Sequence, residues 1–97
     1  MRQGEFWELN FGKVLVVSSD PHNDHPLNAP VVVPVVRGYG RPAGAAVALS
    51  EADPVSGVVL STLVAAVERP QDGRALGMIT GASMHRVMAE IGELFAY

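Results

Sequence analysis

Two runs of β-branched residues end abruptly in polar side chains, and this pattern constrains the fold more than any other feature of the sequence. The first run covers Val14 to Val17, and the second, interrupted by one proline, covers Val31 to Val36. Short β-branched runs bounded by turn-forming residues are typical of buried strands. The first run leads into Ser18-Ser19-Asp20 and the second into Arg37-Gly38-Tyr39. Because functional groups gather where rigid strands lead into loops, we expect a site at these strand exits.

The rest of the sequence up to residue 79 predicts further short strands joined by turns. The expected strands are Glu5 to Phe11, Ala45 to Leu49, Val58 to Leu60, Ala65 to Val67 and Leu76 to Ile79. Gly12 is expected to form the turn after the first strand, and the proline-rich stretch from Pro21 to Pro30 is expected to be a loop. Pro34 predicts an edge strand, a bulge or a missing ladder hydrogen bond.

The end of the sequence changes to a helical period. Apolar residues share one helical face, namely Met84, Val87, Met88, Ile91, Leu94 and Phe95. We expect a helix from about Gly81 to about Ala96, with Thr80 as its N-cap and the methionines as core filler. Several short strands and one closing helix predict an α+β fold, mainly β. The expected form is a small, strongly bent antiparallel sheet or barrel in a single domain covering residues 1–97.

Composition excludes several classes of function. The sequence has no cysteine and three scattered histidines, so neither a disulfide framework nor a zinc site is expected. Its apolar runs are far shorter than the ~20 residues that span a bilayer, and the first residues do not resemble a secretory signal, so we expect a cytoplasmic protein. The net charge of −3 does not indicate general nucleic-acid binding. Residues 1–48 balance to zero, so a polyanion would have to bind a local patch in this half.

The order of short motifs resembles the MazF/PemK family of toxin endoribonucleases, which shares a fold superfamily with CcdB. The matching pieces are Gly4-Glu5-Phe6-Trp7, Val14 to Ser18, Val31 to Pro34, Asp53 to Val59 and Leu76-Gly77. The resemblance implies an SH3-like barrel with a C-terminal helix, a homodimer, and a cognate antitoxin whose tail occupies the RNA groove. It also implies cleavage of single-stranded RNA at a short sequence, without a metal ion or cofactor.

RNA cleavage of this kind has definite chemical needs, and the sequence departs from the usual way of meeting them. A ribose 2′-oxygen must lose a proton, the phosphorane must be stabilised by charge or donors, and the leaving oxygen needs a proton. The family usually has an arginine just before the second strand and a threonine or serine at the end of the third. Here those positions hold Gly12 and Val36, although a shift of one residue would let Lys13 take the place of the arginine.

Three functions fit this pattern. In the first, the chain is a ribonuclease with a rearranged site, in which Lys13 or Arg37 steadies the phosphorane and His22 moves protons near neutral pH. In the second, the chain binds RNA or an antitoxin and has lost catalysis. In the third, it is a CcdB-like inhibitor of DNA gyrase, because the ending Phe95-Ala96-Tyr97 loosely resembles the aromatic-containing tripeptide of that type.

Further polar residues flank the two strand exits and are candidates for RNA binding. Ser18, Ser19 and Asn23 could bind phosphate or base edges, although hydroxyls at strand ends often satisfy backbone donors instead. Tyr39 could stack on an unpaired base between the cations Arg37 and Arg41. The sequence therefore predicts an RNA groove lined by residues 18–28 and 37–44.

Overall fold

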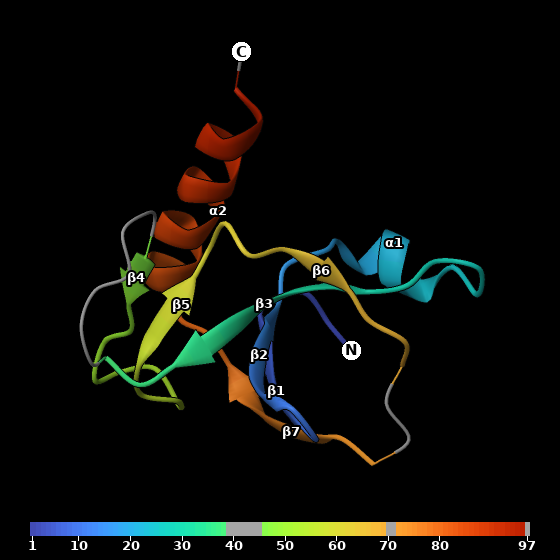
Figure 1. The fold of residues 1–97 in the computed structure, drawn as a ribbon, viewed down its shortest axis with the longest axis horizontal. Coiled ribbons are helices and arrows are strands. Elements are labelled where there is room, and N and C mark those ends of the chain that lie inside the picture. Colours follow the sequence, from blue (N-terminus) through green and yellow to red (C-terminus); the bar gives the residue numbers. More distant parts are fainter. Residues whose placement is uncertain (39–45, 70–71, 97) are drawn as a thin grey trace.

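The computed structural model describes residues 1–38, 46–69 and 72–96 (Figure 1). Within these residues the elements are β1 (Glu5–Leu9), β2 (Gly12–Val16), α1 (Asp20–Asp24), β3 (Val31–Val36), β4 (Ala46–Ala48), β5 (Val58–Leu60), β6 (Ala65–Ala66), β7 (Arg74–Met78) and α2 (Gly81–Phe95).

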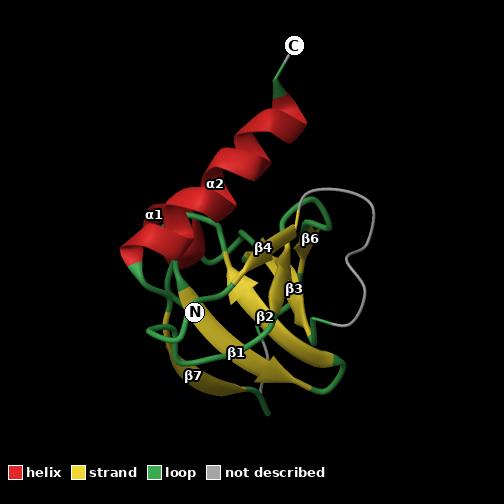
Figure 2. Cartoon of the chain, turned by 90° about the vertical axis from the view of Figure 1, so that its left-hand side faces the viewer, coloured by secondary structure: helices red, strands yellow, loops and turns green. Residues whose placement is uncertain are grey.

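The strands form one bent antiparallel sheet in the order β4-β5-β3-β2-β1-β7, with β6 paired to β3. The first and last strands of this order, β4 and β7, are not paired with each other in the described residues, so the sheet is not closed. The predicted mainly-β fold with a C-terminal helix is confirmed, as an open sheet. Figure 2 shows both helices on one side of this sheet.

The central strands are buried on both faces, which explains why their sequences are continuous β-branched runs. Successive residues on a strand project to opposite faces. Leu15 and Val33 therefore lie in the larger core cluster with Phe6, whereas Val14 and Val16 lie in a smaller cluster on the other face. Complete burial of one such side chain stabilises the fold by about 1.5–3 kcal/mol.

Pro34 lies where the edge of β3 changes partner. β5 pairs with Val35 and Val36, and β6 pairs with Val31 and Val32, so no strand pairs with the stretch between them on this edge. On its other edge β3 pairs with β2, with Pro34 opposite Val14. Because proline has no N–H to donate, it fits at this break. Of the three expectations for Pro34, the missing ladder bond is confirmed.

Helix α2 packs on the sheet as far as Ile91, and its last turn does not. Thr80 is the N-cap, as expected, and its hydroxyl accepts a hydrogen bond from the Ser83 N–H at 3.3 Å. Val87 is fully buried in the larger cluster, whereas Met88, Leu94 and Phe95 are exposed. Figure 2 shows the C-terminal half of α2 extending beyond the sheet. The methionine at position 88 is thus not core filler.

The structure corrects the prediction of a loop from Pro21 to Pro30. Residues Asp20–Asp24 form the short helix α1, with Ser19 as the N-cap and the proline in the first turn. A proline is tolerated there because the first N–H groups of a helix have no intrahelical partner. Three strand boundaries also differ by two residues: β1 ends early, at Leu9, and β2 and β7 begin early, at Gly12 and Arg74.

Candidate functional site

The polar residues that follow β2 form a closed network at one end of the β2–β3 pair. The Ser18 hydroxyl accepts from the Val31 N–H at 2.9 Å and donates to Asn23 Oδ1 at 2.5 Å. The side-chain amide of Asn23 donates to the Ser18 carbonyl at 3.0 Å, and this side chain is only 4% exposed. These mutual bonds fasten α1 to the start of β3. We call Ser18, Asn23 and Val31 the Ser18 network.

Ser19 and His22 are also engaged within this end of the molecule. The Ser19 hydroxyl accepts from the His22 N–H at 3.3 Å, which caps α1. His22 Nε2 lies 2.9 Å from the Ala29 carbonyl oxygen. Since a carbonyl can only accept, this contact requires the proton on Nε2. In this structure the His22 side chain is therefore hydrogen-bonded to the loop between α1 and β3.

The opposite end of the same strand pair carries exposed cations. Lys13 lies near the start of β2 and pairs in register with Val35 of β3. Arg37 follows β3 directly, two residues beyond that pair, and both cations are exposed. Neither makes an ion pair or a side-chain hydrogen bond with any other described residue. Their charges are therefore available to a ligand.

The structure separates the predicted site residues into two groups. It brings Lys13 and Arg37 together at one end of β3, and it places Ser18, Ser19, His22 and Asn23 at the other (Figure 1). Tyr39 and Arg41 lie outside the described residues. Within the described chain, the predicted groove walls 18–28 and 37–38 thus flank opposite ends of β3 and do not face each other.

The tight β1–β2 turn explains why position 12 holds glycine. Leu9 pairs with Gly12, so only Asn10 and Phe11 connect the strands, and Gly12 has φ 130°. Residues with a side chain rarely adopt this conformation. By strand alternation Gly12 lies on the face of the smaller cluster and Lys13 on the face of the larger one. If Lys13 takes the place of the arginine expected at position 12, its charge therefore lies on the opposite face of the sheet.

A third cation was missed by the sequence reasoning because only strand pairing brings it near. Arg74 of β7 pairs in register with Glu8 of β1, which in turn pairs with Lys13. The Arg74 guanidinium lies 3.4 Å from a Glu8 carboxylate oxygen, and both side chains are largely exposed. No local motif indicates a contact between residues so far apart in the sequence.

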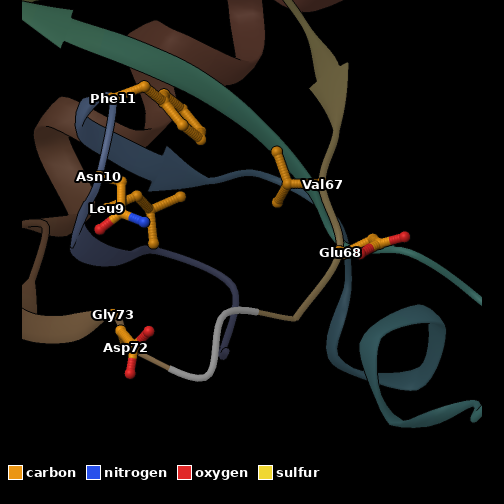
Figure 3. A pocket seen from close by; sticks show the side chains of 7 residues that line it. All are labelled: Leu9, Asn10, Phe11, Val67, Glu68, Asp72 and Gly73. Carbon is orange, nitrogen blue, oxygen red and sulfur yellow. The ribbon is translucent and has the colours of Figure 1, made fainter.

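A hollow of about 290 Å³ opens beside the β1–β2 turn (Figure 3). It is lined by Leu9, Asn10, Phe11, Val67, Glu68, Asp72 and Gly73. The Phe11 side chain is 72% exposed, and Figure 3 shows its ring directed across the opening toward Val67. The sequence reasoning placed Phe11 in a strand and so overlooked it. The ring offers a surface on which a base can stack, but the hollow lies on the face of the smaller cluster, to which Leu9 and Val67 belong, and Lys13 lies on the other face.

Asp53 anchors the start of α2 through a second closed network. Its carboxylate accepts hydrogen bonds from Ser50 (2.9 Å from N and 3.0 Å from Oγ), from the Thr80 N–H at 2.8 Å and from the Ser83 hydroxyl at 2.6 Å. Burial alone would raise the pKa of Asp53, but the bonds from Ser83, Thr80 and Ser50 outweigh it and hold the pKa well below its usual range. Sequence reasoning assigned Asp53 only to a turn.

The described residues include neither a metal-binding cluster nor a membrane-spanning helix. No group of three or more His, Cys, Asp or Glu side chains could hold a metal ion. No helix among them has the length and apolar character needed to cross a membrane.

Comparison with solved structures places this fold. MazE–MazF from Deinococcus radiodurans (crystal form II) superposes with a TM-score of 0.80 at 27% identity, covering 97% of this chain and 93% of that chain. An endoribonuclease in complex with its cognate antitoxin, from a mycobacterial species, gives 0.84 at 22% identity, covering 100% and 98%. The chain is MazF-like. The resemblance to this family that the sequence indicated is confirmed. No protein-family model and no curated protein matches the sequence.

The structure shows where Gly12 and Val36 lie, the two positions at which the sequence departs from the family pattern. Both residues lie at the same end of the sheet as Lys13 and Arg37. Val36 is 39% exposed and offers no hydroxyl, and Gly12 adopts a backbone that disfavours arginine. In this MazF-like chain, positive charge at that end comes from the neighbouring positions instead.

Proposed function

We propose that this chain is the toxin of a toxin–antitoxin pair, an endoribonuclease that cleaves single-stranded RNA at a short sequence without a metal ion. Support comes from structural neighbours described as an endoribonuclease with its cognate antitoxin and as MazE–MazF complexes. The single observation that carries the proposal for this chain is a pair of exposed cations, Lys13 and Arg37, at one end of the β2–β3 pair, neither of which has an ion-pair partner among the described residues.

Lys13 and Arg37 suit the electrostatic part of the reaction. Attack of the 2′-oxygen on the neighbouring phosphate builds negative charge on the phosphorane oxygens, and fixed cations stabilise that charge. An arginine can hold two phosphate oxygens at once, whereas a lysine acts as a point charge. We assign Arg37 to orienting the phosphate and Lys13 to neutralising it.

The described residues near Lys13 and Arg37 include no side chain that we assign to proton transfer. His22 stays a prediction from the sequence. It lies at the other end of β3 and its Nε2 is bonded to Ala29, which argues against His22 and Lys13 acting on one phosphate within a single chain. When cations hold the phosphate, water can accept the proton of the 2′-oxygen as the P–O2′ bond forms, and water can donate a proton to the 5′-oxygen as the P–O5′ bond breaks. We therefore assign no proton-transfer residue to the described part of the chain.

We further propose a homodimer, with the exposed apolar end of α2 at the interface. A groove of about 300 Å³ lies between this helix and the Ser18 end of the sheet. Its apolar walls include Val64, Met88, Ile91 and Phe95. Exposed apolar patches of this kind mark protein–protein contacts. The cognate antitoxin is the second expected partner, and a monomeric mass in light scattering at micromolar concentration would contradict the dimer.

The direct test is incubation of the purified protein, in EDTA, with a long single-stranded RNA, followed by mapping of the cuts by primer extension. The proposal predicts discrete cuts whose 5′ fragments end in 2′,3′-cyclic phosphate. An intact, folded protein that makes no cuts would contradict it. Gyrase inhibition would then be tested with a variant that lacks Ala96 and Tyr97, because the CcdB-like alternative requires that ending.

A further inference from the structure

The cations of the described chain fall into two sets according to what holds them. Arg2 pairs with Asp20 at 2.8 Å, whereas Arg69 and Arg86 donate to main-chain carbonyls. These three side chains fasten parts of the fold together. Among the described residues, Lys13 and Arg37 have no such partner, and Arg74 has only Glu8, at 3.4 Å between two exposed side chains; these three cations form the second set.

The second set lies at one end of the strands, where β7, β1, β2 and β3 are side by side. Residues at matching register positions on β7, β1, β2 and β3 are Arg74, Glu8, Lys13 and Val35. Because neighbouring strands are about 4.8 Å apart, Arg74 and Lys13 lie roughly 10 Å apart with Glu8 between them. Arg37 lies off this row, two residues further along the β3 chain from Val35. We call Arg37, Lys13 and Arg74 the basic edge.

A hollow of about 400 Å³ adjoins the basic edge at Arg37, lined by Arg37, Gly38, Ser56 and Gly57. Here the turn before β5 approaches the end of β3 closely, since a Cβ added to Gly57 would lie 2.4 Å from the Val36 carbonyl oxygen. The exposed Ser56 and Arg37 therefore line the same hollow. A guanidinium and a hydroxyl around one hollow form a suitable site for a phosphate group.

We propose that the RNA backbone binds along the basic edge, with the phosphate that Lys13 neutralises held by Arg37 and Ser56 and the adjoining strand contacted by Arg74. The inference rests on the proposed function, and it adds Ser56 and Arg74 as binding residues. Glu8 lies between two of the cations and opposes the binding of a phosphate strand by its own charge.

The test measures binding of a fluorescent single-stranded oligonucleotide with 2′-O-methyl groups, which cannot be cleaved because its 2′-oxygens are blocked. Arg74→Gln should lower the affinity about three- to tenfold and reduce the slope of log K against log salt by about 0.7. Ser56→Ala should lower the affinity about threefold. Glu8→Gln should raise it, a gain that general damage to the fold does not produce.

The matched control is Arg2→Gln, which removes an arginine of the first set and should leave affinity and salt slope unchanged. An unchanged affinity and slope in Arg74→Gln, or no rise in Glu8→Gln, would overturn the inference, as would a wild-type protein that does not bind the oligonucleotide. If Arg74→Gln weakens binding of an acidic peptide and not of the oligonucleotide, the edge is a protein-docking site and the inference is also overturned.

The same measurements separate this inference from the proposed function. Wild-type protein that binds the blocked strand through the basic edge but makes no cuts in RNA would support the inference and contradict the nuclease. Protein that cuts RNA equally well with and without Arg74 and Ser56 would support the nuclease and overturn the inference.

Discussion

The two ends of the β2–β3 pair use polar residues in opposite ways. At the Ser18 network each hydroxyl and amide bonds to a neighbour, so the polar groups connect α1 with the start of β3. At the basic edge the cations are exposed, and Lys13 and Arg37 contact no acidic partner within the described chain. Satisfied polar groups stabilise a fold, whereas exposed charges contribute little to it. We conclude that the first end serves the structure and the second is available to bind a ligand.

The largest expected effect comes from removing charge at the basic edge. Lys13→Ala and Arg37→Ala should each reduce the rate of RNA cleavage about 100-fold or more, because a fixed donor to the developing charge is lost. Their urea midpoints should stay close to that of the wild type. Arg2→Ala is the charge-matched control at the other end of the sheet. Cleavage at the wild-type rate by both variants would show that the basic edge does not take part in the reaction.

Asp53→Asn tests whether a closed network acts on stability rather than on cleavage. Asparagine keeps an acceptor for the Thr80 N–H but puts an amide NH2 where an oxygen accepts three hydrogen bonds from Ser50 and Ser83, which should destabilise the fold by about 2–3 kcal/mol at pH 7. Because the folded-state pKa of Asp53 is depressed, its contribution is present above the unfolded pKa of about 3.9 and is lost as the pH falls below it. Urea melts between pH 7 and pH 3 should show a steeper acid loss in the wild type than in the variant. Parallel pH profiles would contradict this account.

Ser18→Ala tests whether the Ser18 network serves stability or cleavage. The substitution leaves the Val31 N–H and the Asn23 side chain without a partner, which should lower the free energy of unfolding by about 1–2 kcal/mol. Folded protein should cleave RNA at close to the wild-type rate. A stable variant that has lost cleavage would show that this end takes part in the chemistry.

The smallest effect is expected for His22→Ala. The His22 ring bonds to the Ala29 carbonyl at the end away from Lys13, so the pH–rate profile of cleavage should keep its shape. A profile that loses one ionisation in the variant would restore His22 to proton transfer, with a second copy of the chain as the way to bring it near the cations.

The elements of the fold could be predicted because their signals are local. The β-branched runs marked β2 and β3, and the helical period after Thr80 marked α2. Helix α1 was missed because its proline and asparagine, followed by two more prolines up to residue 30, indicated a loop, although Ser19 followed by Pro21 is also a pattern of a helix start.

The site was harder to predict because it depends on strand pairing. The polar residues after the two runs were expected to meet, but antiparallel pairing of β2 with β3 puts their exits at opposite ends. Likewise, the approach of Arg74 to Lys13 depends on β1 lying between β7 and β2. Neither arrangement leaves a local signal in the sequence. Lys13 and Arg37 could be singled out because family resemblance pointed to their neighbours, Gly12 and Val36.

The most direct test of the account compares cut maps of one single-stranded RNA, in EDTA, for the wild type, the double variant Lys13→Ala/Arg37→Ala and Ser18→Ala. If Lys13 and Arg37 support cleavage and the Ser18 network does not, the wild type and Ser18→Ala make the same discrete cuts and the folded double variant makes none. Wild-type cuts by the double variant, together with their loss in folded Ser18→Ala, would contradict the account.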